Sequence, residues 1–434
     1  MDSIWREGVV LPRFGKPEGD IRTDVLIIGG GITGILCAYF LQQKGVDYVL
    51  AEGRTICSGI TGNTTAKITV QHGLIYQKMI GSIGVEKTSL YLQANQDAVQ
   101  RYGELCKEID CDFERKPSYV YSLDDRAKLE KEARVLEKIG CMGVLADRTE
   151  LPFPVAGAIG FADQAQFQPL KFLARISKNL RIYENTFVRE VTKNSAVTNQ
   201  GKIHFKKVII ATHFPMNNKH GMYFLKLYQH RSYVIALKNA AQFCGMYVDE
   251  AKTGMSFRNY KEYLLVGGGG HRTGKEGGNW SELWEFARRY YPDALECGYW
   301  AAQDCMSLDH IPYIGRYSRS TPNCYVATGY NKWGITSSMV AARLLTDLIM
   351  EKENPYEEVF VPSRNILKPQ LAVNGFEAVT NLLTISDKRC PHLGCALKWN
   401  AAEHSWDCPC HGSRFDDKGT LLNNPANGNL DVGK

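Results

Sequence analysis

The stretch DVLIIGGGITG at residues 24–34 decides the fold of this chain. Residues 24–28 form an apolar run of strand length, and a Gly-x-Gly-x-x-Gly pattern follows without a gap. An apolar-periodic helix is predicted from there through Leu41, and a second strand over residues 47–51, closed by Glu52. The chain therefore opens with one βαβ unit of about thirty residues.

The glycines of this unit have the spacing of a phosphate cradle. Gly29 makes the tight turn, Gly31 lets a pyrophosphate approach the main chain, and Gly34 lets helix and strand pack closely. The helix start supplies amide donors, and a carboxylate at the position of Glu52 can bind ribose hydroxyls. A glycine-rich turn without function is the alternative, which the strand, the helix and Glu52 together disfavour. The pattern predicts a dinucleotide cofactor and leaves FAD and NAD open.

Further elements mix helices with strands. A Ser122-x-x-Asp125 pattern predicts the start of one helix. Between residues 228 and 266, short β-rich runs alternate with turn residues, which is typical of an antiparallel sheet. Apolar spacing predicts helices over residues 90–105, 129–136 and 337–348, and buried strands over residues 207–212 and 323–328.

A polar connection with several prolines divides the chain. Such composition is typical of a linker, which we place at residues 351–369. The predicted domains are therefore residues 1–350 and residues 370–434.

Composition narrows the classes of protein. The 434 residues are 44% hydrophobic and 23% charged, as in ordinary globular proteins. The net charge of +6 is small and dispersed, which argues against a nucleic-acid partner. The first residues show no secretion signal, and no run approaches the ~18 apolar residues of a membrane span. A cytoplasmic protein without a membrane span is predicted.

Several segments after the βαβ unit resemble the D-amino-acid oxidase-like (DAO) family of FAD-dependent oxidoreductases. The likeness covers roughly residues 20–350, in the family's order, through AEGR at 51–54, SGITGNTTAK at 58–67, TFVREV at 186–191, IAT at 210–212, IPYIG at 311–315 and TGYNKWGIT at 328–336. One departure is His213, where many flavoproteins have glycine.

This resemblance implies an α/β fold and FAD as the cofactor. A Rossmann-like FAD-binding domain would carry an inserted antiparallel-sheet substrate subdomain at about residues 85–150 and 225–305. The residues implied to bind FAD are Gly29, Gly31, Ile32, Thr33, Gly34, Glu52, Gly53, Arg54, Ser58, Gly59, Thr64, Thr65, Ala66, Val188, Ala211, Thr212, Gly315, Gly329, Lys332, Trp333, Gly334, Ile335 and Thr336.

Four of the thirteen cysteines cluster near the C-terminus: Cys390, Cys395, Cys408 and Cys410. Without a secretory context, such clustering indicates a metal site rather than a disulfide scaffold. The Cys-x-His and Cys-x-x-His arms could bind zinc, but zinc leaves two cysteines unexplained. A Rieske [2Fe–2S] cluster takes two thiolates on one iron and two imidazoles on the other, and fits the arms better.

The same block closely resembles the Rieske proteins of bc-type complexes, including Gly394, Gly412-Ser413 and Pro425. Helical spacing over residues 376–383 replaces the strands that usually precede the first ligand loop. A small, reduced all-β Rieske domain is therefore predicted, supported in part by the flavin domain. The resemblance implies the metal ligands Cys390, His392, Cys408 and His411, and a Cys395–Cys410 disulfide.

The two cofactors together predict a converter between two-electron and one-electron chemistry. The DAO resemblance implies that the donor is an amine or amino acid, which loses a hydride to FAD. Electrons would then pass singly through the cluster to an acceptor protein or a quinone. One alternative is a flavin–Rieske electron-transfer component that serves a partner and has no small substrate. A redox sensor, or another FAD chemistry, is a further alternative.

Five residues are candidates for the catalytic centre. Arg231 with Tyr233, and Arg258 with Tyr260, have the two-residue spacing that places each pair on one sheet face. Each pair could hold a substrate carboxylate, and ordinary sheet residues are the alternative. His72 lies where some relatives carry a histidine bonded covalently to the flavin. A non-covalent contact and a structural role are the alternatives for His72.

Overall fold

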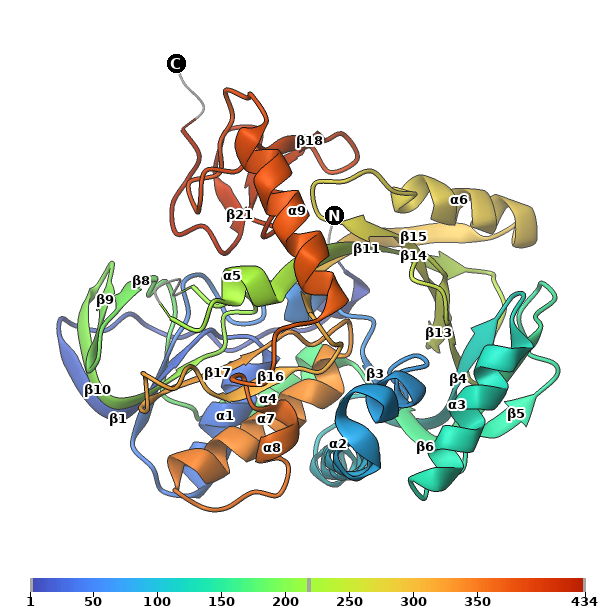
Figure 1. Cartoon of the computed structure of the whole chain (residues 1–434), viewed down its shortest axis with the longest axis horizontal. Coiled ribbons are helices and arrows are strands. Elements are labelled where there is room, and N and C mark those ends of the chain that lie inside the picture. Colours follow the sequence, from blue (N-terminus) through green and yellow to red (C-terminus); the bar gives the residue numbers. More distant parts are fainter. Residues whose placement is uncertain (1–2, 217–219, 432–434) are drawn as a thin grey trace.

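The computed structural model describes residues 3–216 and 220–431 (Figure 1). Residues 1–2, 217–219 and 432–434 lie outside this description. The predicted start of the first domain, residue 1, and the predicted end of the second, residue 434, are among them. Three sheets organise the described residues: a mostly parallel sheet, a larger mixed sheet beside it, and a small sheet packed above both (Figure 1).

The first sheet carries the predicted βαβ unit at its centre. Strand β1 (Ile21–Ile28) pairs in parallel with β10 on one side and β2 on the other. Val25 and Ile27 enter one hydrophobic core, and Leu26 and Ile28 enter another, which explains the unbroken apolar run. The sheet also contains β2 (Tyr48–Ala51), β7 (Ile182–Tyr183), β8 (Val188–Val191), β9 (Ser195–Thr198), β10 (Gly201–Ile210), β16 (Tyr313–Arg316) and β17 (Cys324–Thr328).

The second sheet confirms the predicted antiparallel subdomain. All its pairings are antiparallel except that of β12 with β4. Its strands are β3 (Lys67–Ile68), β4 (Glu114–Ser122), β5 (Val144–Ala146), β6 (Gly157–Gln166), β11 (Leu227–Lys238), β12 (Met246–Asp249), β13 (Ser256–Tyr260), β14 (Tyr263–Arg272) and β15 (Leu295–Ser307). Strands β3 and β6 extend this sheet beyond the predicted limits of the subdomain.

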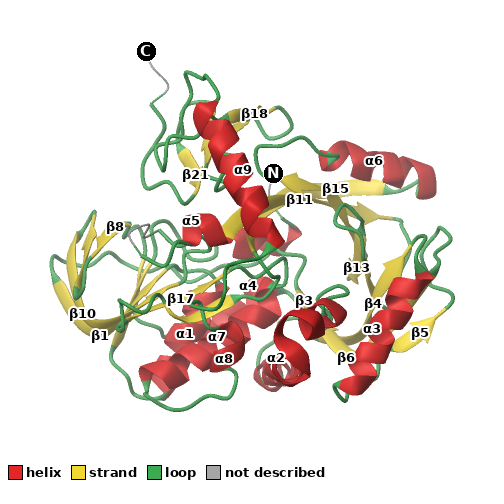
Figure 2. Ribbon diagram, in the orientation of Figure 1, coloured by secondary structure: helices red, strands yellow, loops and turns green. Residues whose placement is uncertain are grey.

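Helices cover both large sheets (Figure 2). The helix predicted behind the Ser122-x-x-Asp125 signal is α3, which begins at Arg126 because the carboxylate of Asp125 caps it by accepting from Lys128 N at 3.1 Å. The helical segments are η1 (Ile4–Arg6), α1 (Ile32–Gln43), η2 (Ile60–Asn63), α2 (Tyr76–Cys106), α3 (Arg126–Lys138), α4 (Pro169–Ser177), α5 (Tyr223–Lys226), α6 (Asn279–Tyr290), α7 (Gly334–Ile349) and α8 (Glu357–Phe360).

The C-terminal part is a small domain, as predicted. Helix α9 (Pro369–Leu383) stands where the sequence indicated helical spacing, directly before the cysteine cluster. Four short antiparallel strands follow: β18 (Lys398–Asn400), β19 (Ser405–Asp407), β20 (Arg414–Asp416) and β21 (Leu421–Asn423). Among the described residues, no helix has the length and apolar character needed to cross a membrane.

Candidate functional site

The glycine cradle follows β1 directly and leaves no room for side chains. Gly29 has a φ of +111°, and a Cβ there would lie 2.5 Å from the carbonyl oxygen of Ala211. A Cβ on Gly34 would overlap the carbonyl oxygen of Gly29. The carboxylate of Glu52 accepts a hydrogen bond from the amide of Gly30 at 2.6 Å. Burial raises the pKa of Glu52, and the amides of Arg54 and Gly30 oppose this effect.

A cavity of about 850 Å³ opens from this cradle, beyond the carboxyl ends of β1, β2 and β10. Ligands of open α/β sheets bind at this edge. All residues predicted to bind FAD line the cavity except Gly34, Ala66, Gly315 and Thr336. The bare main chain at the cradle and the volume fit a dinucleotide, and these residues would hold FAD.

His72 also lines the cavity. Its ring stacks on Trp333, with centroids 5.0 Å apart. Nδ1 lies 2.7 Å from the Tyr91 hydroxyl, and Nε2 lies 2.8 Å from the carbonyl oxygen of Thr69. Burial lowers the pKa of His72 to about 3, so the imidazole is neutral. A covalent bond to a flavin would require one of these two hydrogen bonds to break.

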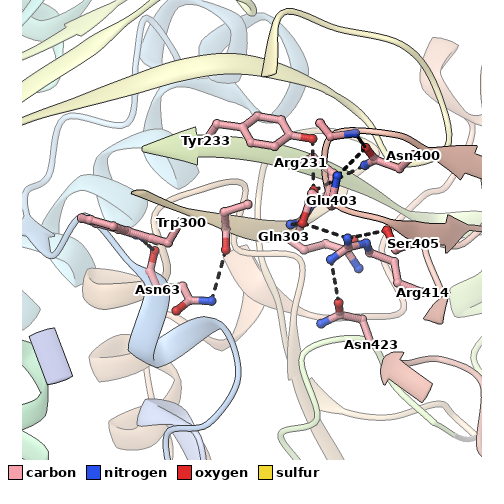
Figure 3. Close-up of polar contacts among 12 residues, drawn as sticks. Asn63, Arg231, Tyr233, Trp300, Gln303, Asn400, Glu403, Ser405, Arg414 and Asn423 are labelled. Carbon is pink, nitrogen blue, oxygen red and sulfur yellow. Dashed lines mark hydrogen bonds and ion pairs between the residues drawn. The ribbon is translucent and has the colours of Figure 1, made fainter. Parts of the chain in front are cut away.

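Arg231 and Tyr233 share one sheet face, but the carboxylate they hold belongs to the chain itself (Figure 3). Both Nε and Nη2 of Arg231 donate to Glu403, with the Nε bond at 2.8 Å, and the Tyr233 hydroxyl donates to Glu403 at 3.1 Å. Burial would raise the pKa of Glu403, but Arg231 and Arg414 outweigh it and lower the pKa to about 2. Arg231 thus contacts a carboxylate of the Rieske domain, and its substrate-carboxylate role stays a prediction that this contact does not support.

Arg258 and Tyr260 also bind partners within the protein. Nη1 of Arg258 donates to the carbonyl oxygens of Thr65 and Ala66, each at 2.8 Å. The Tyr260 hydroxyl donates to Asp112 at 2.7 Å. Tyr233 lines the cavity, whereas Arg231, Arg258 and Tyr260 are not among the residues that line it. Neither arginine is therefore placed to hold a substrate carboxylate in the cavity.

Polar groups that the sequence did not single out lie in the cavity wall. His230 on β11 is paired with Asp304 on β15, and Ser232 donates to Asp304 at 3.4 Å. Burial raises the pKa of Asp304 and lowers that of Lys332, a cavity residue that the resemblance had already implied. Among the described residues, Nδ1 of His230 is a buried nitrogen without a hydrogen-bond partner. The alternation of side chains along a strand predicts which residues share a face of the sheet. Which face lines a cavity depends on the elements that pack around the sheet.

The predicted cluster ligands converge. Cys390 and Cys408 are buried, and the rings of His392 and His411 lie 4.9 Å apart. A hydrogen bond with Cys408 lowers the pKa of the Cys390 thiol to about 7. Burial lowers the pKa of His392 to about 4 and that of His411 to about 3. The imidazoles are therefore neutral, which is the form that binds metals.

The histidine nitrogens provide a test of fit for an iron–sulfur cluster. Both ring nitrogens of His392 and Nδ1 of His411 are buried without a hydrogen-bond partner in the described part of the chain. Buried polar atoms are rarely left unpaired, so coordination is a consistent explanation. Two thiols and two unpaired imidazoles match the Rieske donor set, and these four residues would hold the cluster.

A disulfide joins the two cluster loops, residues 390–395 and 408–413. It links Cys395 and Cys410, whose Cα atoms are 6.7 Å apart. The pairing predicted from the resemblance is confirmed.

The flavin domain supports the cluster loops, as predicted. Gln229 donates to the carbonyl oxygen of His411 at 2.8 Å, and Gln303 donates to that of Gly412 at 2.8 Å. Gly412 has a φ of +82°, and a Cβ there would lie 2.6 Å from Cβ of Gln229. The ring of Phe214 lies 6.3 Å from that of His392 and 6.2 Å from that of His411.

Comparisons with known proteins agree with both sites. A family model described as FAD dependent oxidoreductase (DAO) matches residues 24–348, and one described as Rieske [2Fe-2S] domain matches residues 365–433. The Rieske 2Fe-2S iron-sulfur protein YhfW of Bacillus subtilis is 34% identical, over 98% of this chain and 96% of its own. The cytochrome b6-f complex iron-sulfur subunit of Nostoc punctiforme is 51% identical over 37 residues, which are 8% of this chain and 21% of that protein.

Solved structures share the fold of the first domain. Glycine oxidase from Geobacillus kaustophilus superposes with a TM-score of 0.68 at 19% identity, covering 80% of this chain and 100% of the oxidase. L-proline dehydrogenase from P. horikoshii gives a TM-score of 0.65 at 17% identity, with 80% and 98% covered.

Proposed function

Because the chain belongs to the DAO family of FAD-dependent oxidoreductases and ends in a Rieske [2Fe–2S] domain, we propose that it oxidises an amine or amino acid by hydride transfer to FAD and delivers the electrons singly, through the cluster, to an external acceptor. Bound FAD accepts two electrons at once, whereas a [2Fe–2S] cluster passes one at a time. This combination distinguishes the protein from an oxidase that returns both electrons to dioxygen.

The observation that carries the proposal is a short segment joining the cavity to the cluster ligands. Thr212 and His213 line the cavity, and the next residue, Phe214, packs its ring against both ligand histidines. Asn424, in the Rieske domain, donates to the carbonyl oxygens of Thr212 and Phe214, each at 2.7 Å. The two sites are thus linked by packed and hydrogen-bonded atoms rather than separated by solvent.

The Rieske domain also forms part of the cavity wall. Residues 421–424 and 426–429 line the cavity together with the flavin domain. Gln229 extends the link, since its Nε2 contacts the carbonyl oxygens of both His411 and Asn424. A rigid connection of this kind favours internal electron transfer over release of electrons from the cavity.

On the substrate side, Asp304 is suited to an amine. A substrate ammonium must lose a proton before hydride leaves the neighbouring carbon. The raised pKa of Asp304 makes it a better base than an ordinary aspartate, and Ser232 orients its carboxylate. Asp304 is therefore the proposed proton acceptor, a position that no motif indicated.

An anaerobic substrate screen tests the proposal. The holoprotein is mixed with a panel of amines and amino acids, and flavin bleaching is followed together with the electron paramagnetic resonance of the reduced cluster. We expect a panel member to bleach the flavin and to reduce the cluster within the same chain. Asp304→Asn should slow bleaching at least about tenfold, as expected for loss of a general base.

A matched variant separates a specific role of Asp304 from general disturbance. Asp249→Asn alters another carboxylate of the cavity wall and should bleach at nearly the normal rate. If only NAD(P)H or a reduced protein bleached the flavin, the electron-transfer component without its own small substrate would be favoured instead.

A further inference from the structure

Helix α9 has its polar side turned inward and its apolar side turned outward. Asn374 and Asn381 are buried. Asn374 accepts from Nη1 of Arg272 at 3.0 Å and donates to the carbonyl oxygen of Leu225 at 3.2 Å. A helix on the surface of a soluble protein normally shows the opposite arrangement. The inversion therefore needs an explanation beyond packing within this chain.

The outward side is strongly exposed. Phe376 is 71% exposed and Leu383 is 76% exposed, and Ile385, just after the helix, is 96% exposed. Val373, Phe376, Val379 and Leu383 are three to four residues apart, which places their side chains along one side of the helix. Contiguous apolar surface of this kind marks a docking site. We call this surface the α9 apolar face; it consists of Val373, Phe376, Val379, Leu382, Leu383 and Ile385.

The chain segment that carries the α9 apolar face has an excess of positive charge. Residues 366–400 contain four basic residues, Lys368, Lys388, Arg389 and Lys398, and only two acidic ones. One of the acids, Glu377, is neutralised by Lys275 at 2.9 Å. The surroundings are therefore complementary to an anionic surface.

We propose that the α9 apolar face docks this protein on an anionic phospholipid surface. An apolar stripe on one helix, flanked by Lys and Arg, is the arrangement with which interfacial helices enter the headgroup layer. A stable protein interface needs about 20–30 residues on each side, whereas this face is a narrow row along an outer helix (Figure 1). The observations thus favour a membrane over a second copy of the chain.

Docking through α9 would bring the cluster domain to the membrane. The carbonyl oxygen of Asn381 accepts from Ala396 N at 2.9 Å, and Arg389 donates to the carbonyl oxygens of Leu382, at 3.2 Å, and Gly394, at 2.8 Å. These bonds fix the first cluster loop to the end of the helix. If the proposed function holds, a lipid-soluble quinone is then the acceptor class within reach; membrane docking itself does not depend on that function.

Vesicle flotation of the holoprotein tests the docking. Phosphatidylcholine vesicles are compared with vesicles in which part of this lipid is replaced by phosphatidylglycerol. We expect binding to the anionic vesicles, weakened by added salt. The double variant Phe376→Ser, Leu383→Ser should bind at least about tenfold more weakly, because burial of each large apolar side chain contributes more than a tenfold change in affinity.

Control variants make the result specific. Met142→Ser, Val144→Ser removes two apolar side chains that are 88% and 66% exposed elsewhere on the surface, and it should bind as the original chain does. Lys398→Gln should weaken binding to the anionic vesicles severalfold. Unchanged flavin absorbance and cluster signal would show that each variant is folded.

Two outcomes would overturn the proposal. One is that the original chain binds neither kind of vesicle. The other is that gel filtration shows self-association that the Phe376→Ser, Leu383→Ser variant abolishes, which would assign the face to a second copy instead. Because flotation needs no substrate, a failure here is distinguishable from a failure of the proposed function.

Discussion

The flavin cavity and the cluster site recognise their cofactors with different parts of the chain. The cavity begins with bare main chain at Gly29 and Gly31, and its wall draws on segments from Ile28 to Asn429. The predicted cluster ligands are side chains from two loops, residues 390–395 and 408–413. An added side-chain atom at the glycine cradle should therefore impair FAD binding, whereas loss of a ligand side chain should impair binding of the cluster.

The largest effect is expected from loss of a cluster ligand. Cys408→Ser removes a buried thiolate donor and should abolish the [2Fe–2S] cluster while FAD stays bound. Iron and labile sulfide, measured beside flavin absorbance, provide the readout. Cys244→Ser changes an exposed cysteine away from the cluster loops and is the matched control. A full complement of cluster in Cys408→Ser would refute the ligand assignment.

The second effect concerns the cradle. Gly34→Ala places a Cβ against the carbonyl oxygen of Gly29, which belongs to fixed main chain, so FAD content should fall severely. Gly81→Ala on α2 is the control, because a Cβ there meets nothing within 4 Å and Gly81 does not line the cavity. Flavin per chain after gel filtration is the measurement. Equal flavin content in the two variants would show that close packing at Gly34 does not matter.

A third change tests the contact between the two regions. Glu403→Gln removes the carboxylate that pairs with the buried Arg231, leaves Arg414 with Asp407, and should cost about 3–5 kcal/mol in the free energy of unfolding. Glu104→Gln breaks an exposed pair with Arg101 and should cost at most about 1 kcal/mol. Denaturant unfolding compares them. Similar losses would mean that the Glu403 network contributes no more than a surface ion pair.

The smallest effect is a dependence on pH in the flavin domain. Burial lowers the pKa of His72 from 6.5 to about 3, so the unfolded chain binds a proton here that the folded chain does not. Stability should therefore decline as the pH falls below 6.5 towards 3. In that window His72→Gln should reduce the slope by about 1.4 kcal/mol per pH unit. Unfolding curves above and below pH 6.5 measure this slope, and an unchanged slope would contradict the assignment.

Local spacing in the sequence was enough to predict the cradle, whereas the disulfide pairing was predicted from the resemblance to Rieske proteins. Gly29, Gly31 and Gly34 lie within one turn and one helix start, so their spacing sets the main-chain geometry directly. The helix before Cys390 was also predictable, because apolar periodicity is a property of neighbouring residues.

The groups that Arg231 and Asp304 contact were decided only by the tertiary structure. Arg231 has the chemistry to hold a substrate carboxylate, yet it meets Glu403, which is 172 positions away in the sequence. Asp304 carries no motif and becomes a candidate base only because β11 and β15 bring it beside His230 at the cavity. The apolar spacing of α9 predicted a helix, but not that its apolar side would face outward. The physical reason is that spacing determines local conformation, whereas burial and charge pairing depend on surfaces that folding brings together from distant parts of the chain.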